Sequence, residues 1–167
     1  MQLETLSVFF RYNDWANDQI LLSAGQVGDA KLDQPFDMGP GSLRRTLMHI
    51  LITEDVWLKR SQGQRETPWP DEGQRILVAQ MKERLDGTRR ERDAFLAGLK
   101  DGDLPRPMVY RDSLGSLYST TLGDMIFQVC THSLHHRAQA VNMLRGVGCK
   151  PPELDYMYWM RRAVERG

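Results

Sequence analysis

Apolar residues recur at every third or fourth position over four long stretches of the chain, with polar and charged residues between them. This spacing places the apolar residues on one face of an amphipathic α-helix. We therefore expect helices at about residues 2–25, 43–60, 73–99 and 122–145. Stretches rich in glycine and proline separate the first three helices. The pattern predicts an all-α protein, an antiparallel four-helix bundle that forms one domain over residues 1–167.

Residues at the ends of two of these stretches are typical helix start and stop signals. Ser42 precedes the second stretch and is a favourable N-cap residue. Thr121 precedes the fourth stretch and has Asp124 three residues later, which resembles a capping box with aspartate in the usual glutamate position. Gly146 and Gly148 follow the last periodic residues and end the same helix.

The connection before the fourth helix and the C-terminal tail carry weaker signals. Apolar pairs at residues 109–110 and 117–118 flank a turn-forming sequence at 112–115, a pattern compatible with a short hairpin. After two consecutive prolines, the tail from residue 154 to residue 166 is compatible with one more short helix. We expect both as additions to the bundle.

Composition narrows the classes of function. The chain is 41% hydrophobic and 26% charged, which is normal for a globular protein, and 22 basic residues balance 22 acidic ones. A sequence-independent nucleic-acid binder needs a basic excess, so we expect no nucleic-acid partner. No apolar stretch approaches the length of a membrane span, and the N-terminus lacks a signal-peptide pattern. We therefore expect no membrane association and a cytoplasmic location.

Three of the four histidines lie within one short sequence, HSLHH, at residues 132–136. His132 and His136 are one helical turn apart, so they differ by about 40° of rotation and their Cβ atoms lie roughly 5–6 Å apart. Two imidazoles in this arrangement can bind one metal ion. His135 is rotated by about 100° from His136 and points away from the pair. We therefore take His132 and His136 as candidate metal ligands and leave His135 out.

The remaining histidine, His49, lies in the middle of the apolar second helix, where an unpaired imidazole would be unfavourable. By elimination it is the third candidate ligand, although a hydrogen bond to a buried asparagine or to Glu54 would also satisfy it. Three protein ligands leave positions open for water or substrate, as in catalytic sites, whereas structural zinc sites fill all four. We expect a divalent transition metal, namely zinc, nickel or iron.

Polar residues on otherwise apolar helix faces are further candidates. Asn13 and Asn17 would support the metal site or, as we favour, fix helix packing through hydrogen bonds. Glu54 would orient a ligand imidazole or act as a base, and it would equally well pair with Arg92 or Arg137. Apart from Glu54, the sequence indicates no catalytic residue.

Two other side chains lie close to the candidate ligands in the sequence. Gln139 lies one turn beyond His135 and His136 and is placed to support a ligand imidazole. Cys130 is rotated by about 160° from His132 around the helix, which makes it a poor ligand and favours a small buried side chain.

Three motifs occur in order along the chain. The first is YNDWAN at residues 12–17, the second is His49 followed by Glu54 and Trp57, and the third is HSLHHRAQ at residues 132–139. Together they resemble the DinB-like proteins of the DinB/YfiT superfamily, and their order and spacing match over nearly the whole chain. The combination is specific, although each motif alone is weak.

The resemblance implies a four-helix bundle with a metal site between its helices, with ligands at His49, His132 and His136. It also implies a class of chemistry, because the family includes metal-dependent thiol S-transferases that use low-molecular-weight thiols and a thiol-dependent isomerase. Many members are dimers, so we expect a homodimer. The chain departs from the family pattern at Ala138, where glycine is common, and at Gln128, where some members have a further histidine.

Two classes of function are compatible with these features. In the first, the protein is a metal-dependent enzyme of the thiol S-transferase or hydrolase type. The metal would lower the pKa of a low-molecular-weight thiol or of water, and the substrate would be a small molecule. In the second class, the protein is a non-enzymatic, stress-related protein that binds a metal or a small ligand without turnover.

Overall fold

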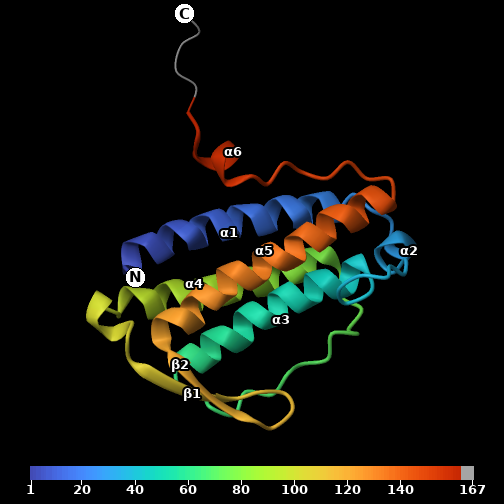
Figure 1. Ribbon diagram of the computed structural model, residues 1–167. Coiled ribbons are helices and arrows are strands. Elements are labelled where there is room, and N and C mark those ends of the chain that lie inside the picture. Colours follow the sequence, from blue (N-terminus) through green and yellow to red (C-terminus); the bar gives the residue numbers. More distant parts are fainter. Residues whose placement is uncertain (163–167) are drawn as a thin grey trace, which may run out of the picture.

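Four long helices lie side by side along most of the length of the molecule (Figure 1). The structure is a computed structural model in which residues 1–162 are described. The long helices are α1 (Leu3–Ala24), α3 (Leu43–Ser61), α4 (Val78–Ala97) and α5 (Leu122–Gly146). Helices α1 and α3 each contact both α4 and α5, so the four helices form a closed bundle. The prediction of an all-α four-helix bundle is confirmed.

Short elements connect and extend the bundle. They are α2 (Asp29–Leu32), η1 (Asp101–Asp103), β1 (Pro107–Arg111), β2 (Leu117–Thr121) and α6 (Tyr156–Met160). The two strands pair antiparallel with Val109 opposite Ser119, which confirms the hairpin before the last long helix. Asp112 Oδ1 closes its turn by accepting the backbone N–H groups of Leu114 at 2.9 Å and Ser116 at 2.8 Å.

Some boundaries differ from the prediction for identifiable reasons. Helix α4 begins at Val78 and not at residue 73, because Arg44 Nη1 donates a hydrogen bond to the carbonyl of Ile76 at 2.9 Å and holds the preceding chain outside the helix. Helix α2 falls within the expected loop, since four residues are too few to give a periodic signal. The tail helix covers Tyr156–Met160, and residues 163–166 of its predicted range lie outside the described residues.

The four helices run in two directions, two each way (Figure 1). Helices α3 and α5 are antiparallel, as are α1 and α4, whereas α1 runs parallel to α5 and α3 runs parallel to α4. The parallel α3–α4 pair requires the chain to return along the bundle, and the segment at residues 62–77 does this without forming a helix. Its residues can span about 50 Å when extended, which exceeds the roughly 30 Å length of α4.

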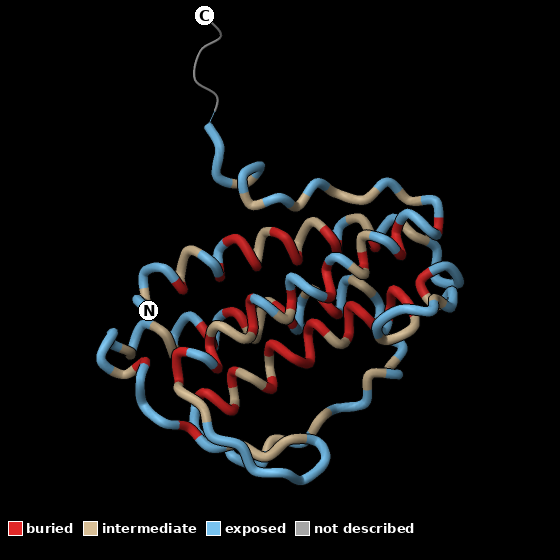
Figure 2. Tube along the Cα trace, in the orientation of Figure 1, coloured by how far each residue is buried: buried red, intermediate tan, exposed pale blue. Residues whose placement is uncertain are grey.

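Buried apolar side chains form two clusters, one toward each end of the bundle. Ile20 and Met48 belong to the first cluster, and Leu6 and Ile126 belong to the second. Figure 2 shows that the buried stretches of the four helices face one another. Between the two clusters lies a layer of buried polar side chains, which comprises Asn13, Asn17, Glu54, Ser133 and Arg137. On the apolar face of α1, Leu6, Phe10 and Ile20 are buried, and so are Asn13 and Asn17 on the same face.

Ser42 and Thr121 cap the starts of α3 and α5 as predicted, but the capping box expected at α5 differs, because the Asp124 carboxylate accepts from the Thr121 hydroxyl at 2.6 Å and not from its backbone N–H. The Ser42 hydroxyl accepts a hydrogen bond from the backbone N–H of Arg45 at 3.2 Å, and Thr121 Oγ1 accepts from the N–H of Asp124 at 3.1 Å. Within residues 1–162, no helix is both long enough and apolar enough to cross a membrane.

Removing the cap of α5 tests this account of the helix start. Thr121→Ala should lower the free energy of unfolding by about 1 kcal/mol, because one N–H group of the first turn loses its partner. Thr131→Ala, an exposed change in the middle of the same helix, is the control and should leave stability within about 0.5 kcal/mol of the wild type. Urea unfolding followed by circular dichroism measures both. Equal stability of the two variants would contradict the assignment.

Candidate metal centre

The three candidate histidines lie together between α3 and α5. His49 comes from the middle of α3, and His132 and His136 come from α5. One ring nitrogen from each lies within 4.8 Å of the others, so the cluster could hold a metal ion. The ring centroid of His49 is 4.9 Å from that of His132 and 4.4 Å from that of His136. The structure thus brings together the residues chosen from the sequence.

The spacing within the cluster fits two ligands of one metal ion. His49 Nε2 lies 3.2 Å from His132 Nε2. Two nitrogens bound to a tetrahedral ion at about 2.0–2.1 Å lie about 3.3–3.4 Å apart, close to the observed separation. Two neutral imidazoles at this distance share at most one hydrogen bond, whereas a metal ion satisfies the lone pairs of both. The donor set therefore fits a transition metal.

His136 is oriented by Gln139, one turn later on α5. His136 Nδ1 lies 2.7 Å from Gln139 Oε1, and because an amide oxygen only accepts hydrogen bonds, Nδ1 carries the proton. Nε2 of His136 is then free to bind a metal. Gly39 lies directly against Gln139, since a Cβ added there would be 2.2 Å from Gln139 Oε1, and its φ of +48° also favours glycine.

His135, the neighbour of His136, lies outside the cluster. Its side chain is exposed, and its Nε2 lies 3.2 Å from Gln139 Nε2. This position agrees with the expectation, drawn from helical rotation, that His135 is not a ligand.

Glu72 is a neighbour of the site that the sequence did not indicate. It lies in the segment between α3 and α4, and its Oε1 is 2.6 Å from His49 Nδ1. Trp69 Nε1 donates a hydrogen bond to the same oxygen at 2.8 Å. Neither residue belongs to a periodic stretch, so no pattern in the sequence could have placed them beside His49.

Glu54, the candidate base, belongs to the buried polar layer and makes no hydrogen bond to the three histidines. Its Oε1 accepts hydrogen bonds from Asn13 Nδ2 at 2.8 Å, Asn17 Nδ2 at 2.7 Å and Ser133 Oγ at 3.1 Å. The amide oxygens of both asparagines accept from Arg137 Nη1, at 2.8 Å for Asn17. The asparagines therefore connect a carboxylate to a guanidinium, which supports the packing role favoured for them.

The second oxygen of Glu54 lies beside a small cavity. Oε2 has no hydrogen-bond partner among the described residues, and a cavity of about 20 Å³ is lined by Glu54 and Arg92. This volume is sufficient for one water molecule, which would satisfy the buried oxygen. Glu54 makes no hydrogen bond or ion pair with Arg92 or Arg137, so the alternative of a direct pair with one of them is not observed, and the asparagines link it only to Arg137.

Each ligand on α5 precedes a member of the polar layer by one position. Ser133 follows His132, and Arg137 follows His136. Adjacent side chains of a helix point in directions about 100° apart. When the side chains at 133 and 137 face the polar layer, those at 132 and 136 therefore face α3. The hydrogen bonds of Ser133 and Arg137 to the core therefore set the rotation of α5 that presents its two imidazoles to His49.

Comparison with known proteins agrees with this fold and these motifs. The profile of the DinB family matches residues 1–167. The chain belongs to the DinB family. It is 21% identical to Protein DinB of Bacillus subtilis over 157 residues, which are 88% of each chain. The crystal structure of a DinB-like protein from Bacillus cereus superposes with a TM-score of 0.72 at 19% identity, over 91% of this chain and 97% of that one.

The electrostatics of this DinB-family site favour neutral imidazoles. Burial, together with the nearby imidazoles of His136 and His49, lowers the pKa of His132 from 6.5 to about 3. Burial also lowers the pKa of His136, although its hydrogen bond to Gln139 acts in the opposite direction. Because a histidine binds metal through an unprotonated nitrogen, these two residues are in the metal-binding form at neutral pH.

Cys130 and the two tryptophans of the DinB motifs, Trp15 and Trp57, do not join the histidine cluster. Burial raises the pKa of the Cys130 thiol to about 12, which makes it an unreactive apolar side chain, as expected. Trp57 packs against Tyr110 of the hairpin, with ring centroids 5.1 Å apart, and Trp15 packs near Tyr12 at 6.0 Å. These contacts are those expected of side chains that pack between elements of the fold.

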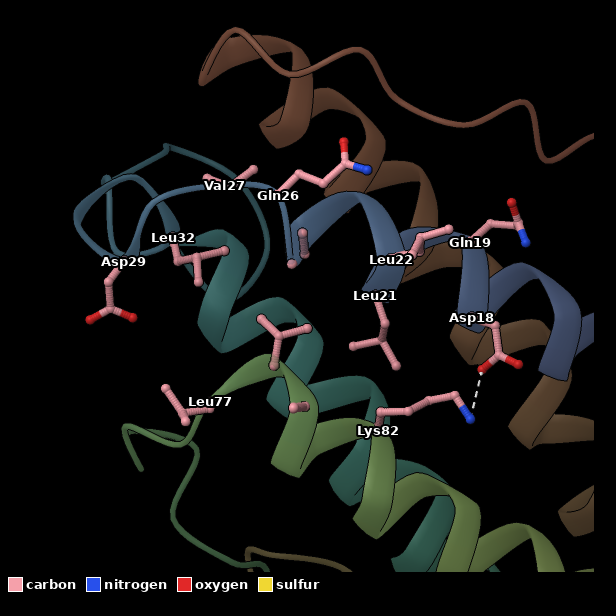
Figure 3. A pocket seen from close by; sticks show the side chains of 14 residues that line it. Asp18, Gln19, Leu21, Leu22, Gln26, Val27, Asp29, Leu32, Leu77 and Lys82 are labelled. Atoms are coloured by element: carbon pink, nitrogen blue, oxygen red, sulfur yellow. Dashed lines mark ion pairs between the residues drawn. The ribbon is translucent and has the colours of Figure 1, made fainter.

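A larger cavity lies elsewhere in the molecule. It has a volume of about 680 Å³ and lies between the end of α1, α2 and the start of α4, with Leu21, Leu22 and Leu77 among its lining side chains (Figure 3). Lys82 lies in this lining but is paired with Asp86 at 2.5 Å and with Asp18 at 3.6 Å. No histidine is among the residues that line this cavity, so it is separate from the histidine cluster.

The histidine pKa values predict how pH changes the stability of the metal-free protein. Because His132 has a lower pKa in the folded state than the 6.5 of an exposed imidazole, the folded state binds fewer protons between about pH 6.5 and pH 3. The free energy of unfolding should therefore fall as the pH decreases through this window. His132→Phe should weaken that dependence and the exposed-site control His135→Phe should not, as measured by thermal melting at several pH values with a chelator. Identical slopes for the two variants would contradict the account.

The polar layer predicts a second effect on stability. Arg137→Met removes the only cation hydrogen-bonded to Asn13 and Asn17 in the described chain, so two buried amide oxygens lose their donor and the Glu54 carboxylate loses the guanidinium to which the asparagines connect it. The expected loss is about 3–5 kcal/mol in the free energy of unfolding. Arg145→Met, which removes an exposed arginine from the same helix, should change it by less than about 0.5 kcal/mol. Urea denaturation compares the two, and similar losses would refute the role assigned to Arg137.

Proposed function

We propose that His49, His132 and His136 bind one divalent transition metal and that the protein is a metal-dependent enzyme of the thiol S-transferase or hydrolase type. The observation that carries the proposal is the convergence of three imidazoles, with two Nε2 atoms 3.2 Å apart, between two antiparallel helices. Zinc, nickel and iron all suit imidazole ligands. The substrate class is a small molecule, with a low-molecular-weight thiol as one reactant.

The composition of the ligand set supports an open site. The ligand cluster contains three histidines, and no carboxylate or cysteine among residues 1–162 joins it. Zinc sites with three protein ligands keep a position for water or substrate, unlike structural sites with four. A metal bound there would supply Lewis acidity that lowers the pKa of a thiol or of water. The chain itself supplies neutral ligands, which leave the positive charge of the ion available to an anionic reactant.

Cys130 and Glu54 do not offer a competing nucleophile. Cys130 is buried with a pKa of about 12, and Glu54 is held by three hydrogen bonds in the polar layer. These contacts favour an added thiol or water as the nucleophile. We also propose a homodimer, on the resemblance to a family in which dimers are common.

Metal analysis tests the ligand assignment. Protein purified without a histidine tag should contain about one equivalent of a transition metal per chain by elemental analysis, since three protein ligands suffice for a stable site. His49→Ala and His132→Ala should lose it, because each removes one ligand. His135→Ala is the matched control and should retain the metal. A metal-free wild type, or retention of metal by both ligand variants, would refute the proposed site.

Activity with thiols tests the reaction class. Metal-loaded protein should accelerate the reaction of a low-molecular-weight thiol with a model aryl halide, in which a carbon–sulfur bond forms as halide leaves. Chelation or His49→Ala should abolish the acceleration. Activated esters test the hydrolase branch under the same conditions. If metal-loaded protein turns over neither class, the non-enzymatic binding function is favoured instead.

A further inference from the structure

The carboxylate of Glu72 lies at the Nδ1 edge of the His49 ring, whereas the Nε2 edge of that ring faces His132. Glu72 Oε1 is 2.6 Å from His49 Nδ1, and both side chains are 18% exposed. The residue belongs to the segment at 62–77, which crosses from α3 back to α4 without regular structure. A mostly covered carboxylate in such a segment requires a polar partner, and the ring of His49 supplies one.

This contact determines which nitrogen of His49 faces the other histidines. A neutral imidazole carries one proton, and a carboxylate against Nδ1 accepts that proton in a hydrogen bond. Nε2 is then unprotonated, and it is the atom that lies 3.2 Å from His132 Nε2. Glu72 therefore selects the tautomer of His49 in which Nε2 is free to coordinate.

The charge of Glu72 distinguishes it from the partners of the other two histidines. His136 Nδ1 faces the neutral amide of Gln139, and His132 Nδ1 has no hydrogen-bond partner within the described part of the chain. Three neutral ligands leave the full double charge of a divalent ion in a partly buried site. A carboxylate hydrogen-bonded to one ligand offsets part of that charge and makes the imidazole a stronger donor.

Trp69 holds the carboxylate in this position. Its Nε1 donates to Glu72 Oε1 at 2.8 Å, so this oxygen accepts from the indole and the imidazole together. The Trp69 ring centroid lies 5.6 Å from that of His49, and its side chain packs against the apolar core. The indole thus limits the positions available to the carboxylate.

We infer that Glu72 is the positioning residue of the metal site, which fixes His49 with Nε2 free for coordination and supplies the negative charge nearest to the ligands. This inference rests on the proposed metal-binding function. Glu72 contacts the imidazole of His49 from a segment outside the helices, so its removal should weaken metal binding while the fold is retained.

Metal affinity is the first test. Glu72→Ala should weaken binding of Zn²⁺ by about 10–100-fold in a competition titration against a chromogenic chelator. Glu72→Gln, which keeps an acceptor without the charge, should fall between that variant and the wild type. Glu66→Ala is the matched control, because Glu66 lies in the same segment, pairs with Arg111 at 3.0 Å and should leave affinity within twofold of the wild type. Equal affinities for Glu72→Ala and Glu66→Ala would overturn the inference.

The tautomer of His49 in metal-free protein is the second test, and it separates this inference from the proposed function. Long-range ¹H–¹⁵N spectra at alkaline pH should show His49 protonated at Nδ1 in the wild type and in Glu66→Ala, and a mixture of tautomers in Glu72→Ala. If the wild type binds no metal but this pattern holds, the proposed function fails and the positioning role of Glu72 stands. If His49 has the same tautomer in Glu72→Ala as in the wild type, the positioning role fails whatever the metal affinity.

Discussion

The burial of the Glu54 carboxylate and the Arg137 guanidinium in the middle of the bundle is the constraint on which the rest of the structure depends. An unpaired carboxylate or guanidinium in an apolar interior costs several kcal/mol, so Glu54 and Arg137 must be compensated. Asn13 and Asn17 provide the compensation, because each amide donates to Glu54 and accepts from Arg137. Helices α1, α3 and α5 are therefore held in one relative rotation and one axial register. Apolar packing alone tolerates many such arrangements.

The candidate metal centre follows from that register. Ser133 and Arg137 face the polar layer, and their preceding neighbours His132 and His136 consequently face α3. The ligands are thus part of rigid helices, whereas the groups that orient them come from different places. Gln139 belongs to α5, but Glu72 arrives from the segment that returns from α3 to α4. The parallel arrangement of α3 and α4 makes this contact available, since a short antiparallel connection would not pass along the bundle.

The sequence predicted those features that repeat with helical spacing, and it missed those that arise from single contacts. Helix spacing identified the long helices and the pair at His132 and His136, and the small number of histidines led to His49. The partners of Glu54 could not be predicted, because hydrogen bonds from the asparagines of α1 to two other helices produce no pattern in the sequence of any single helix. Glu72 was missed for the same reason, since its importance depends on where an irregular segment crosses His49.

The tryptophan beside His49 has an optical consequence. Energy and electron transfer from an excited indole to a bound ion depend on short separation, and the Trp69 ring lies 5.6 Å from the imidazole of His49. An ion with a partly filled d shell, such as nickel, would quench the emission of Trp69, whereas zinc has a filled shell and no such pathway. The intrinsic fluorescence of this chain therefore distinguishes the two kinds of ion at the site without any added probe.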